Sequence, residues 1–301
     1  MFKNYFTWAL LCLSGMAQAC DMCGYSTAAN FMGSLPQIQK SFIGLRYSHI
    51  KFTTEQLSIV PVIHSTKTIN TSTSSDIWCR YAKNIKIQVL INIPFIQNKV
   101  WDNGVVSSVS GIGDATALFN YILVNSTQNK RLKHLWMLNA GIKIPTGKFQ
   151  VLKNELLLNP NIQLGSGSFD LPISTLYSIR KNNISFQSEA NYKLNTYNVN
   201  GYKFGNRWSC LAKLGYWFSL NKLLIIPSTS IILNATSDDK RRNTGVVNYT
   251  GGTSIQAVLG CDIYYKNISA TLNIQKPIYE YLSNGNTHSN ARVLLGVNYL
   301  F

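Results

Sequence analysis

The stretch N-I-S-F-Q-S-E-A-N-Y-K-L, residues 183–194, alternates between apolar and polar side chains along nearly its whole length. One face carries Ile184, Phe186, Ala190, Tyr192 and Leu194, and the other carries Ser185, Gln187, Glu189, Asn191 and Lys193. A two-residue period is that of a β-strand. A packed core would not tolerate so many polar groups on one face, because each buried polar group needs a partner. The stretch therefore predicts a long strand with apolar surroundings on one side and water on the other.

The same alternation recurs along the chain and predicts twelve strands. They cover residues 41–52, 75–83, 85–94, 112–124, 133–146, 165–180, 183–195, 204–218, 223–235, 253–266, 268–278 and 291–301. These segments are longer than the strands of about 5–6 residues that soluble proteins use. They fit the roughly 9–11 residues with which a tilted strand crosses a bilayer.

The connections between these strands fall into two classes. Short connections rich in Asn and Lys lie at 83–84, 181–182, 219–222 and 266–267, with 125–132 as a longer member. The other connections are mostly long and polar, and they lie at 53–74, 95–111, 147–164, 196–203, 236–252 and 279–290. This plan is typical of outer-membrane barrels, where the sheet closes so that every backbone group is paired within lipid. The sequence predicts an all-β fold, a closed antiparallel transmembrane β-barrel of about twelve strands with short periplasmic turns and longer extracellular loops. A soluble two-layer sandwich is the alternative, and the strand lengths and the two loop classes count against it.

The N-terminus holds the one long apolar run. Lys3 precedes the apolar residues 5–13, and the small-residue site Ala17-Gln18-Ala19 follows them. This pattern predicts a secretory signal peptide over residues 1–19. Residues 20–40 then form an N-terminal periplasmic or plug segment, and residues 41–301 form the barrel, with outer-membrane lipid as its surroundings.

Cysteine spacing singles out Cys20 and Cys23, which form C-D-M-C at the start of the mature chain. A disulfide is compatible with the oxidising periplasm. Free thiols, acylation of Cys20 and binding of a soft metal ion such as Cu(I) are the alternatives, although two thiolates make only half of a metal site. The other mature cysteines sit singly on apolar strand faces, where cysteine acts as a small hydrophobic residue.

The composition supports a membrane protein. Charged residues make up 13 % of the chain, about half of the roughly 25 % expected of a soluble protein. No internal run approaches the ~20 apolar residues that a transmembrane helix needs. The net charge of +16 is compatible with an anionic membrane surface or an anion pathway, whereas export argues against nucleic acid as a partner.

The C-terminal segment A-R-V-L-L-G-V-N-Y-L-F ends in Phe301, with Tyr299 and Val297 on the same face. It resembles the terminal strand that the bacterial barrel-assembly machinery recognises, which has an aromatic last residue and apolar residues at every second position before it. The resemblance implies an assembly signal in Val297, Tyr299 and Phe301 and makes that machinery an expected partner.

Further motifs carry a resemblance to a family. S-G-I-G-D-A-T-A-L-F-N-Y-I-L (110–123), G-I-K-I-P-T-G-K (141–148) and G-S-G-S-F-D-L-P-I-S-T-L-Y-S-I-R (165–180) follow one another in a characteristic order, together with F-I-G-L-R-Y (42–47) and the C-D-M-C start. In this order and spacing the chain resembles outer-membrane transporters of the phenol meta-pathway type, especially forms from Bacteroidetes. The resemblance implies a barrel in the outer membrane, and its name implies uptake of small apolar solutes.

The predicted lumen face is basic. It carries Arg46, Arg80, Lys86, Lys143, Arg180, Lys193, Arg207, Lys213 and Arg292, against Asp170, Glu189 and Asp262. These groups could pair and fill the barrel, as interior residues of small barrels do. If the lumen is open, the positive excess predicts a preference for anions.

Catalysis is not expected. His64 and His288 fall in predicted loops, His134 lies at a predicted strand end, and His49 has no acidic partner nearby. Neither a Gly-x-Ser-x-Gly elbow nor a paired carboxylate motif occurs. The G-I-G-D segment lacks the helix and Lys-Ser/Thr pair of a phosphate-binding loop. The sequence therefore predicts a channel or transporter for small solutes of unknown identity, without a cofactor. A plugged or structural barrel, and a barrel whose C-x-x-C binds a soft metal ion, are the alternatives.

Overall fold

The computed structural model describes residues 39–56, 66–102, 104–126, 132–149, 152–153, 156–157 and 162–301. The predicted signal peptide, Cys20, Cys23 and most of the predicted plug segment lie outside the described residues. Among the described residues, no helix is both long and apolar enough to cross a bilayer.

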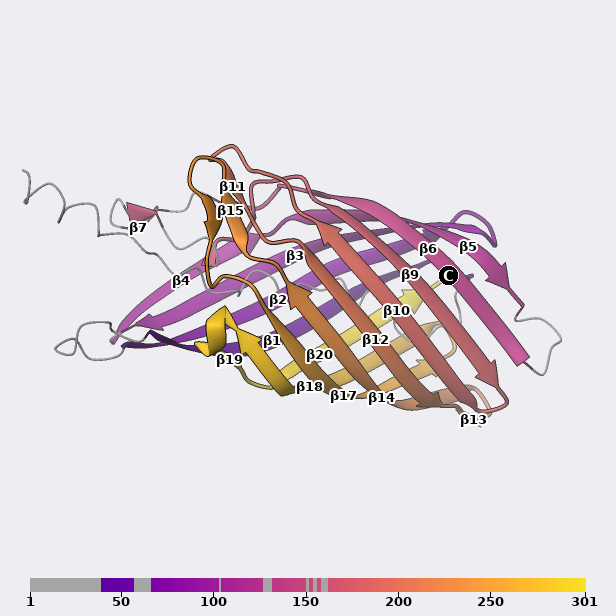
Figure 1. The fold of residues 1–301 in the computed structure, drawn as a ribbon. Helices are drawn as coiled ribbons and strands as arrows, with labels where there is room; N and C mark the ends of the chain where they lie inside the picture. The colour runs from indigo at the N-terminus through magenta and orange to yellow at the C-terminus, as the bar shows by residue number, and fades with distance from the viewer. Residues whose placement is uncertain are drawn as a thin grey trace, which may run out of the picture.

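Twelve antiparallel strands form the wall of a closed barrel, which confirms the predicted fold (Figure 1). They are β1 (Phe42–Gln56), β2 (Thr66–Ala82), β3 (Ile87–Asp102), β5 (Ala115–Asn125), β6 (Leu132–Ile144), β9 (Leu171–Lys181), β10 (Ile184–Leu194), β12 (Arg207–Tyr216), β14 (Leu223–Thr236), β17 (Gly252–Tyr265), β18 (Ile268–Leu282) and β20 (Arg292–Leu300). Each pairs with the next in this order. Strand β20 pairs with both β18 and β1, and this closes the sheet.

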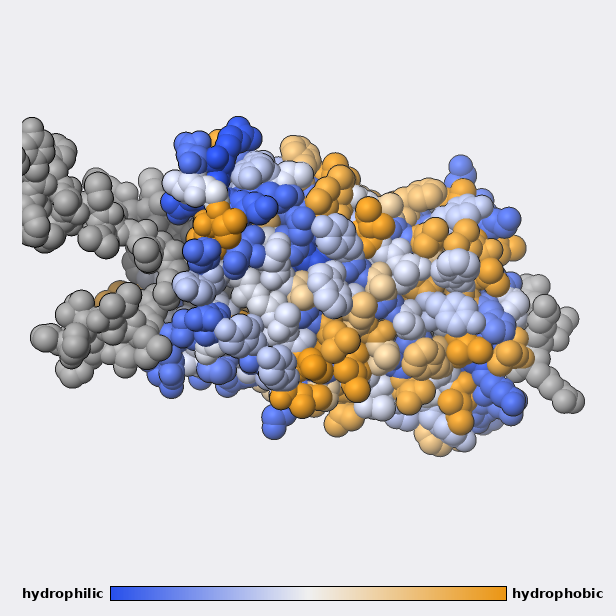
Figure 2. All heavy atoms as spheres, in the orientation of Figure 1, coloured by the Kyte–Doolittle hydropathy of each residue, from blue (hydrophilic) through white to orange (hydrophobic). Residues whose placement is uncertain are grey.

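The predicted alternation sets the two faces of the wall. In β10, Ile184 is 59 % exposed on the outside, whereas Glu189 is 3 % exposed on the inside. Figure 2 shows apolar side chains gathered over the outer surface of the barrel, while the end bearing the long loops is hydrophilic. The same pattern places Val297, Tyr299 and Phe301 outside. This arrangement suits lipid contact, because the apolar side chains face outward and every wall strand is paired on both sides.

The two ends of the barrel differ as predicted. At the end that we call the turn end, two-residue connections follow β9, β13 (Phe218–Leu220) and β17. Asn182, Asn221 and Lys266 adopt φ of 51° in these turns. Tight hairpins require such left-handed conformations, and Asn tolerates them better than most residues. The opposite end, called the loop end here, carries the long connections.

Two of the predicted long loops are largely strand. Residues 53–56 and 66–74 extend β1 and β2, and residues 95–102 extend β3, which pairs there with β4 (Val105–Ile112). The hydrophobic alternation fades in residues 53–56 and 66–74 because most of them are polar on both faces. Their backbone ladder nevertheless continues, and side chains such as Thr and Ser suit exposed strands.

The wall is interrupted between β4 and β5, which both pair with β3. Gly113 donates its N–H to the Pro94 carbonyl at 2.8 Å. Proline has no N–H with which to continue the ladder, so the pairing breaks at this point. The next residue, Asp114, has its carboxylate inside the barrel, where it belongs to the site described below.

The loop end carries small added elements. β11 (Tyr202–Lys203), β15 (Asp239–Arg241) and β16 (Gly245–Val247) form a sheet of three strands that we call the loop sheet. It lies over the loop end of the barrel (Figure 1). The remaining elements are β7 (Leu152–Lys153), β8 (Leu156–Leu157), η5 (Ser283–Gly285) and β19 (Thr287–Ser289).

Apolar side chains fill the lumen toward the turn end. One cluster comprises Phe42, Trp78, Leu90, Leu118 and Leu300, and a second comprises Ile122, Leu135, Met137 and Leu176. We call these two clusters the floor. Met137 and Leu176 are fully buried, and Phe42 and Trp78 pack edge to face at 4.5 Å. The turn-end half of the interior is therefore a packed core.

Candidate functional site

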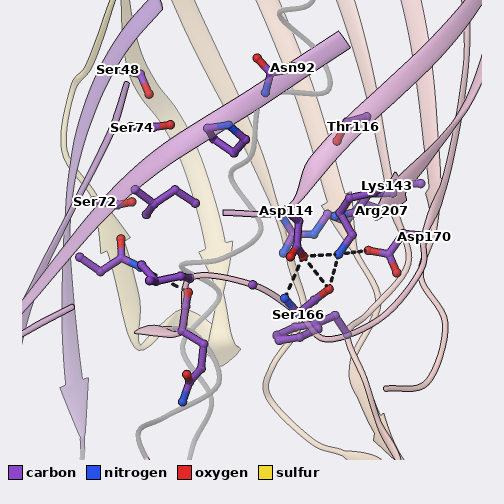
Figure 3. A pocket seen from close by; sticks show the side chains of 18 of the residues that line it. Ser48, Ser72, Ser74, Asn92, Asp114, Thr116, Lys143, Ser166, Asp170 and Arg207 are labelled. Carbon is purple, nitrogen blue, oxygen red and sulfur yellow. Dashed lines mark hydrogen bonds and ion pairs between the residues drawn. The ribbon is translucent and has the colours of Figure 1, made fainter. Parts of the chain in front are cut away.

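A cavity of about 150 Å³ lies inside the barrel on the loop-end side of the floor. We call it the lumen cavity. Ser48, Ser72 and Ser74 lie on one side of it, and Asp114, Lys143, Asp170 and Arg207 lie on the other (Figure 3). The apolar part of the lining comes from Ile50, Pro94, Ile96, Leu164 and Phe204. The cavity can thus hold a small molecule between an apolar wall and an ionic one.

The ionic wall is organised around Lys143 on β6. Its Nζ lies 2.7 Å from Oδ2 of Asp114 and 2.6 Å from Oδ2 of Asp170. The backbones of Lys143 and Asp170 also bond to each other, through an isolated antiparallel bridge. Strand β6 therefore supplies the cation, and the two strand interruptions at Asp114 and Asp170 supply its carboxylates.

Residues 162–166 lie across the lumen above this cavity and are called the partition here. The side-chain amide of Asn98 donates to the Ile162 carbonyl at 3.1 Å. At the other end, the backbone N–H and the hydroxyl of Ser166 donate to Asp114 at 2.9 and 3.0 Å. The partition is thus fixed to β3 and to the ionic wall.

Two glycines allow the partition to approach the wall. The amides of Leu164 and Gly165 donate to the Lys148 carbonyl at 3.1 Å. A Cβ on Gly165 would lie 2.6 Å from the Gly147 carbonyl oxygen, and one on Gly147 would lie 2.9 Å from the Gly165 Cα. Both positions exclude a side chain because real Cβ atoms do not come so close to backbone atoms. This contact explains Gly147 in G-I-K-I-P-T-G-K and Gly165 in the segment that begins G-S-G-S.

A second cavity, of about 600 Å³, lies on the outer side of the partition and is called the vestibule here. Gln163, Gly165, Ser166 and Phe204 line both cavities. These four residues separate the vestibule from the lumen cavity. The loop sheet supplies Tyr202 and Arg241 to the vestibule, and the following residues 242–244 line it as well.

A buried carboxylate holds the loop sheet at the vestibule. Asp239 accepts hydrogen bonds from the Tyr202 hydroxyl and from the Gly205 N–H, the latter at 2.7 Å. Burial raises the pKa of Asp239, and these two hydrogen bonds oppose that rise. Asp239 therefore sets the position of Tyr202 rather than facing a ligand.

Four of the nine predicted lumen cations line the lumen cavity: Lys143, Lys193, Arg207 and Arg292. Two carboxylates, Asp114 and Asp170, line it with them. The formal charge of the lining is therefore positive by two. Because the cavity is enclosed by protein, this excess is screened less than it would be on an exposed surface.

The other predicted cations lie elsewhere. Arg46 bonds to Asp76 through Nε at 3.0 Å and to the Asn92 side chain at 3.1 Å. Arg80 donates to the Lys40 carbonyl at 2.9 and 3.1 Å. Lys213 pairs with Asp262 at 3.0 Å, closer to the turn end. These three cations hold the barrel together and do not line the cavity.

Two cations lie at the turn end itself. Arg180 stacks on the Trp217 ring at 3.8 Å.

The structure corrects the placement of Lys86, which is exposed in the turn before β3 and does not face the lumen. The predicted strand began at residue 85, whereas pairing begins at Ile87. The Asn84 side chain accepts from the N–H groups of residues 86 and 87, which extends the turn.

Sequence reasoning missed three residues of the interior. Asp76 and Asp114 add carboxylates to Asp170, Glu189 and Asp262, so the positive excess is smaller than predicted. The predicted strand 204–218 began at Phe204, but β12 begins only at Arg207, and Phe204 is buried and lines both cavities. The signal for Asp114 was present, since G-I-G-D separates two alternating segments.

The contact between Lys143 and Ser166 resembles a base with its nucleophile, but the geometry argues against that role. The Lys143 ammonium lies between two carboxylates, and the Ser166 hydroxyl donates to one of them. Both groups are thus engaged in holding the partition.

His49 and His134 contact Thr73 and Tyr177 respectively. Within the described ranges, no group of three or more His, Cys, Asp or Glu could hold a metal ion.

Comparison with known proteins identifies related sequences and folds. A family model described as "Putative MetA-pathway of phenol degradation" matches residues 53–255, which is more than half of the chain. A search of curated protein sequences gives no match. The comparisons do not support the narrower assignment to Bacteroidetes forms.

Three solved barrels illustrate the structural likeness. The COG4313 outer membrane channel from Pseudomonas putida F1 has a TM-score of 0.63 at 11 % identity, over 90 % of this chain and 98 % of that one. The translocator domain of the autotransporter NalP from Neisseria meningitidis has a TM-score of 0.47 at 11 % identity, over 90 % of each chain. The beta domain of the Bordetella autotransporter BrkA has a TM-score of 0.49 at 9 % identity, over 87 % of this chain and all of that one. At this identity the first likeness supports the fold of an outer-membrane β-barrel.

Proposed function

The chain belongs to the family of the MetA pathway of phenol degradation, and we propose that it is an outer-membrane conduit for small organic solutes, with a preference for anions. The observation that carries the proposal is the lumen cavity. It is enclosed by the barrel wall, lies beneath the vestibule at the loop end, and is lined by four cations and two carboxylates.

The lining suggests which solutes would fit. Apolar groups from Ile96, Leu164 and Phe204 can contact an organic body, and Arg207 and Lys193 favour a negative charge. Pockets that bind small molecules commonly combine an apolar lining with a few polar groups. The family description and the first structural neighbour, a channel, agree with passage of such solutes.

Passage requires the floor to rearrange. Floor side chains such as Met137 and Leu176 are apolar and fully buried. Hydrophobic constrictions of this kind close channels to ions. We therefore propose that the conformation described is closed at the turn end, whereas the vestibule is accessible from the loop end.

Ion selectivity tests the proposal. In planar bilayers with a salt gradient, the wild type is expected to show a reversal potential of the sign that denotes anion preference, most strongly at low salt. Arg207→Ser should reduce that preference, because it removes a charge from the lumen cavity. Lys86→Ser is the matched control, since it removes an exposed cation from the turn end and should leave selectivity unchanged. Cation preference in the wild type would contradict the proposal.

A plugged barrel is the second candidate, and the packed floor is the observation that favours it. In that case neither ion currents nor uptake of organic anions into proteoliposomes should be detected. Currents that vanish when the protein is omitted would instead exclude the plugged barrel.

A further inference from the structure

The vestibule has the features of a binding site distinct from the lumen cavity. Its volume of about 600 Å³ falls within the roughly 300–1,000 Å³ usual for small-molecule pockets. Two arginines, Arg241 and Arg242, line it, and none of its described lining residues is acidic. Neither guanidinium forms an ion pair with another described residue. The vestibule thus presents two cations whose charge its own lining does not balance.

Aromatic side chains form another part of its lining. Tyr202 and Phe204 pack edge to face, with ring centroids 5.1 Å apart, and both are almost fully buried. Phe149 also lines the vestibule, and its ring packs against Gly167, where an added Cβ would lie 2.5 Å from the nearest ring atom. Gly167 has φ of +68°, which disfavours a larger residue there. The absence of a side chain at this position therefore leaves room for the Phe149 ring.

Each of the two arginines lies close to an aromatic ring. The Arg241 Cζ is 5.9 Å from the centroid of Tyr202, and the Arg242 Cζ is 5.3 Å from that of Tyr197. Stacking on aromatic faces limits the motion of an exposed arginine and leaves its N–H groups available for an acceptor. Asp239 accepts a hydrogen bond from the Tyr202 hydroxyl, and this bond holds in place the ring next to which Arg241 lies.

We propose that the vestibule binds planar aromatic carboxylates before they enter the lumen. A carboxylate matches the fork of a guanidinium, which can donate two parallel hydrogen bonds to it. The ring of such a ligand would pack against Phe149, Tyr202 and Phe204, because aromatic rings favour stacked or edge-to-face contacts. The proposal rests on the function proposed above in that it names the class of solute that the conduit would take.

Calorimetric titration of the full-length mature protein in detergent with sodium benzoate tests the proposal. Phenol supplies a ring without the charge, acetate supplies a charge without the ring, and inorganic phosphate represents a simple anion such as a lipid headgroup. Benzoate should bind at least about tenfold more tightly than any of the three, since only it satisfies both the guanidinium and the rings.

Variants separate the two contributions. The double variant Arg241→Gln with Arg242→Gln should weaken benzoate binding by roughly tenfold or more and leave phenol binding unchanged. Phe149→Ala should weaken benzoate binding and leave acetate binding unchanged. The control is Lys240→Gln with Lys276→Gln, which removes the same charge at exposed positions that do not line the vestibule. This control should change benzoate affinity by no more than about twofold, because exposed charges at a distance are screened.

Three results would overturn the proposal. Equal affinity for phosphate and benzoate would mean a general anion site, as for a lipid phosphate. Equal affinity for phenol would remove the role of the arginines. Benzoate binding that is lost in Arg207→Ser but kept in the Arg241/Arg242 double variant would place the ligand in the lumen cavity instead. That last result would leave the proposed conduit intact, whereas benzoate binding at the vestibule without any transport would refute the conduit and keep the site.

Discussion

Replacing Asp114 by alanine is expected to expose the lumen cavity to reagents added at the loop end. The carboxylate accepts hydrogen bonds from the Ser166 amide and hydroxyl and from the Gly147 amide, and it pairs with Lys143. Its loss frees one end of the partition. Hydrogen bonds to charged groups contribute about 1.5–3 kcal/mol each, so loss of even one should raise the population of the open partition by roughly tenfold.

The measurement is the rate of thiol labelling inside the cavity. Ser72 lines the lumen cavity and does not line the vestibule, so Ser72→Cys in a background without the native cysteines reports access past the partition. A charged thiol reagent added from outside should label this cysteine slowly in the parent and at least about tenfold faster with Asp114→Ala. The readout does not require passage through the floor, so it is independent of whether the conduit is open.

Asp262→Ala is the matched control for this experiment. It also removes a buried carboxylate paired with a lysine, but Asp262 pairs with Lys213 and does not contact the partition. Labelling of Ser72→Cys should therefore stay at the parent rate. If both variants accelerate labelling equally, the effect comes from loosening of the barrel, and residues 162–166 do not act as a partition.

The wall of the barrel could be predicted from sequence because lipid imposes a simple rule. Side chains such as Leu45, Leu259 and Tyr299 must face outward, and their alternating partners face inward, so a two-residue period fixes both register and closure. The strand count and the two kinds of ends followed from the same pattern. Above the bilayer the rule no longer applies, and for that reason the extensions of β1, β2 and β3 were predicted to be loops.

The site could be predicted only in part because pairing inside the lumen depends on three-dimensional neighbours. Alternation assigned Lys143, Lys193, Arg207 and Arg292 to the lumen face, and these four residues line the lumen cavity. It could not show that Lys143 is held between two carboxylates, because Asp114 and Asp170 lie 29 residues before it and 27 after it in the chain. The partition and the vestibule come from irregular segments whose position is set by single contacts, such as Asn98 with the Ile162 carbonyl. Periodicity carries no information about such contacts.

The pairing of Lys213 with Asp262 leads to the prediction with the largest effect on stability. The two side chains are 12 % and 2 % exposed and lie on different strands, with N–O at 3.0 Å. Removing one member of a buried pair commonly costs about 3–5 kcal/mol, whereas replacing both members by apolar residues is often neutral or stabilising. Lys213→Met should therefore lower the free energy of unfolding by about this amount, and the double variant Lys213→Met with Asp262→Leu should recover most of it.

Either single variant leaves one buried charge without its partner. Asp262→Leu should therefore lower the free energy of unfolding as well. Denaturant unfolding of the four proteins in lipid, followed by the shift between folded and unfolded bands on gels, measures the cycle. Additive effects in the double variant would show that the pair is not coupled.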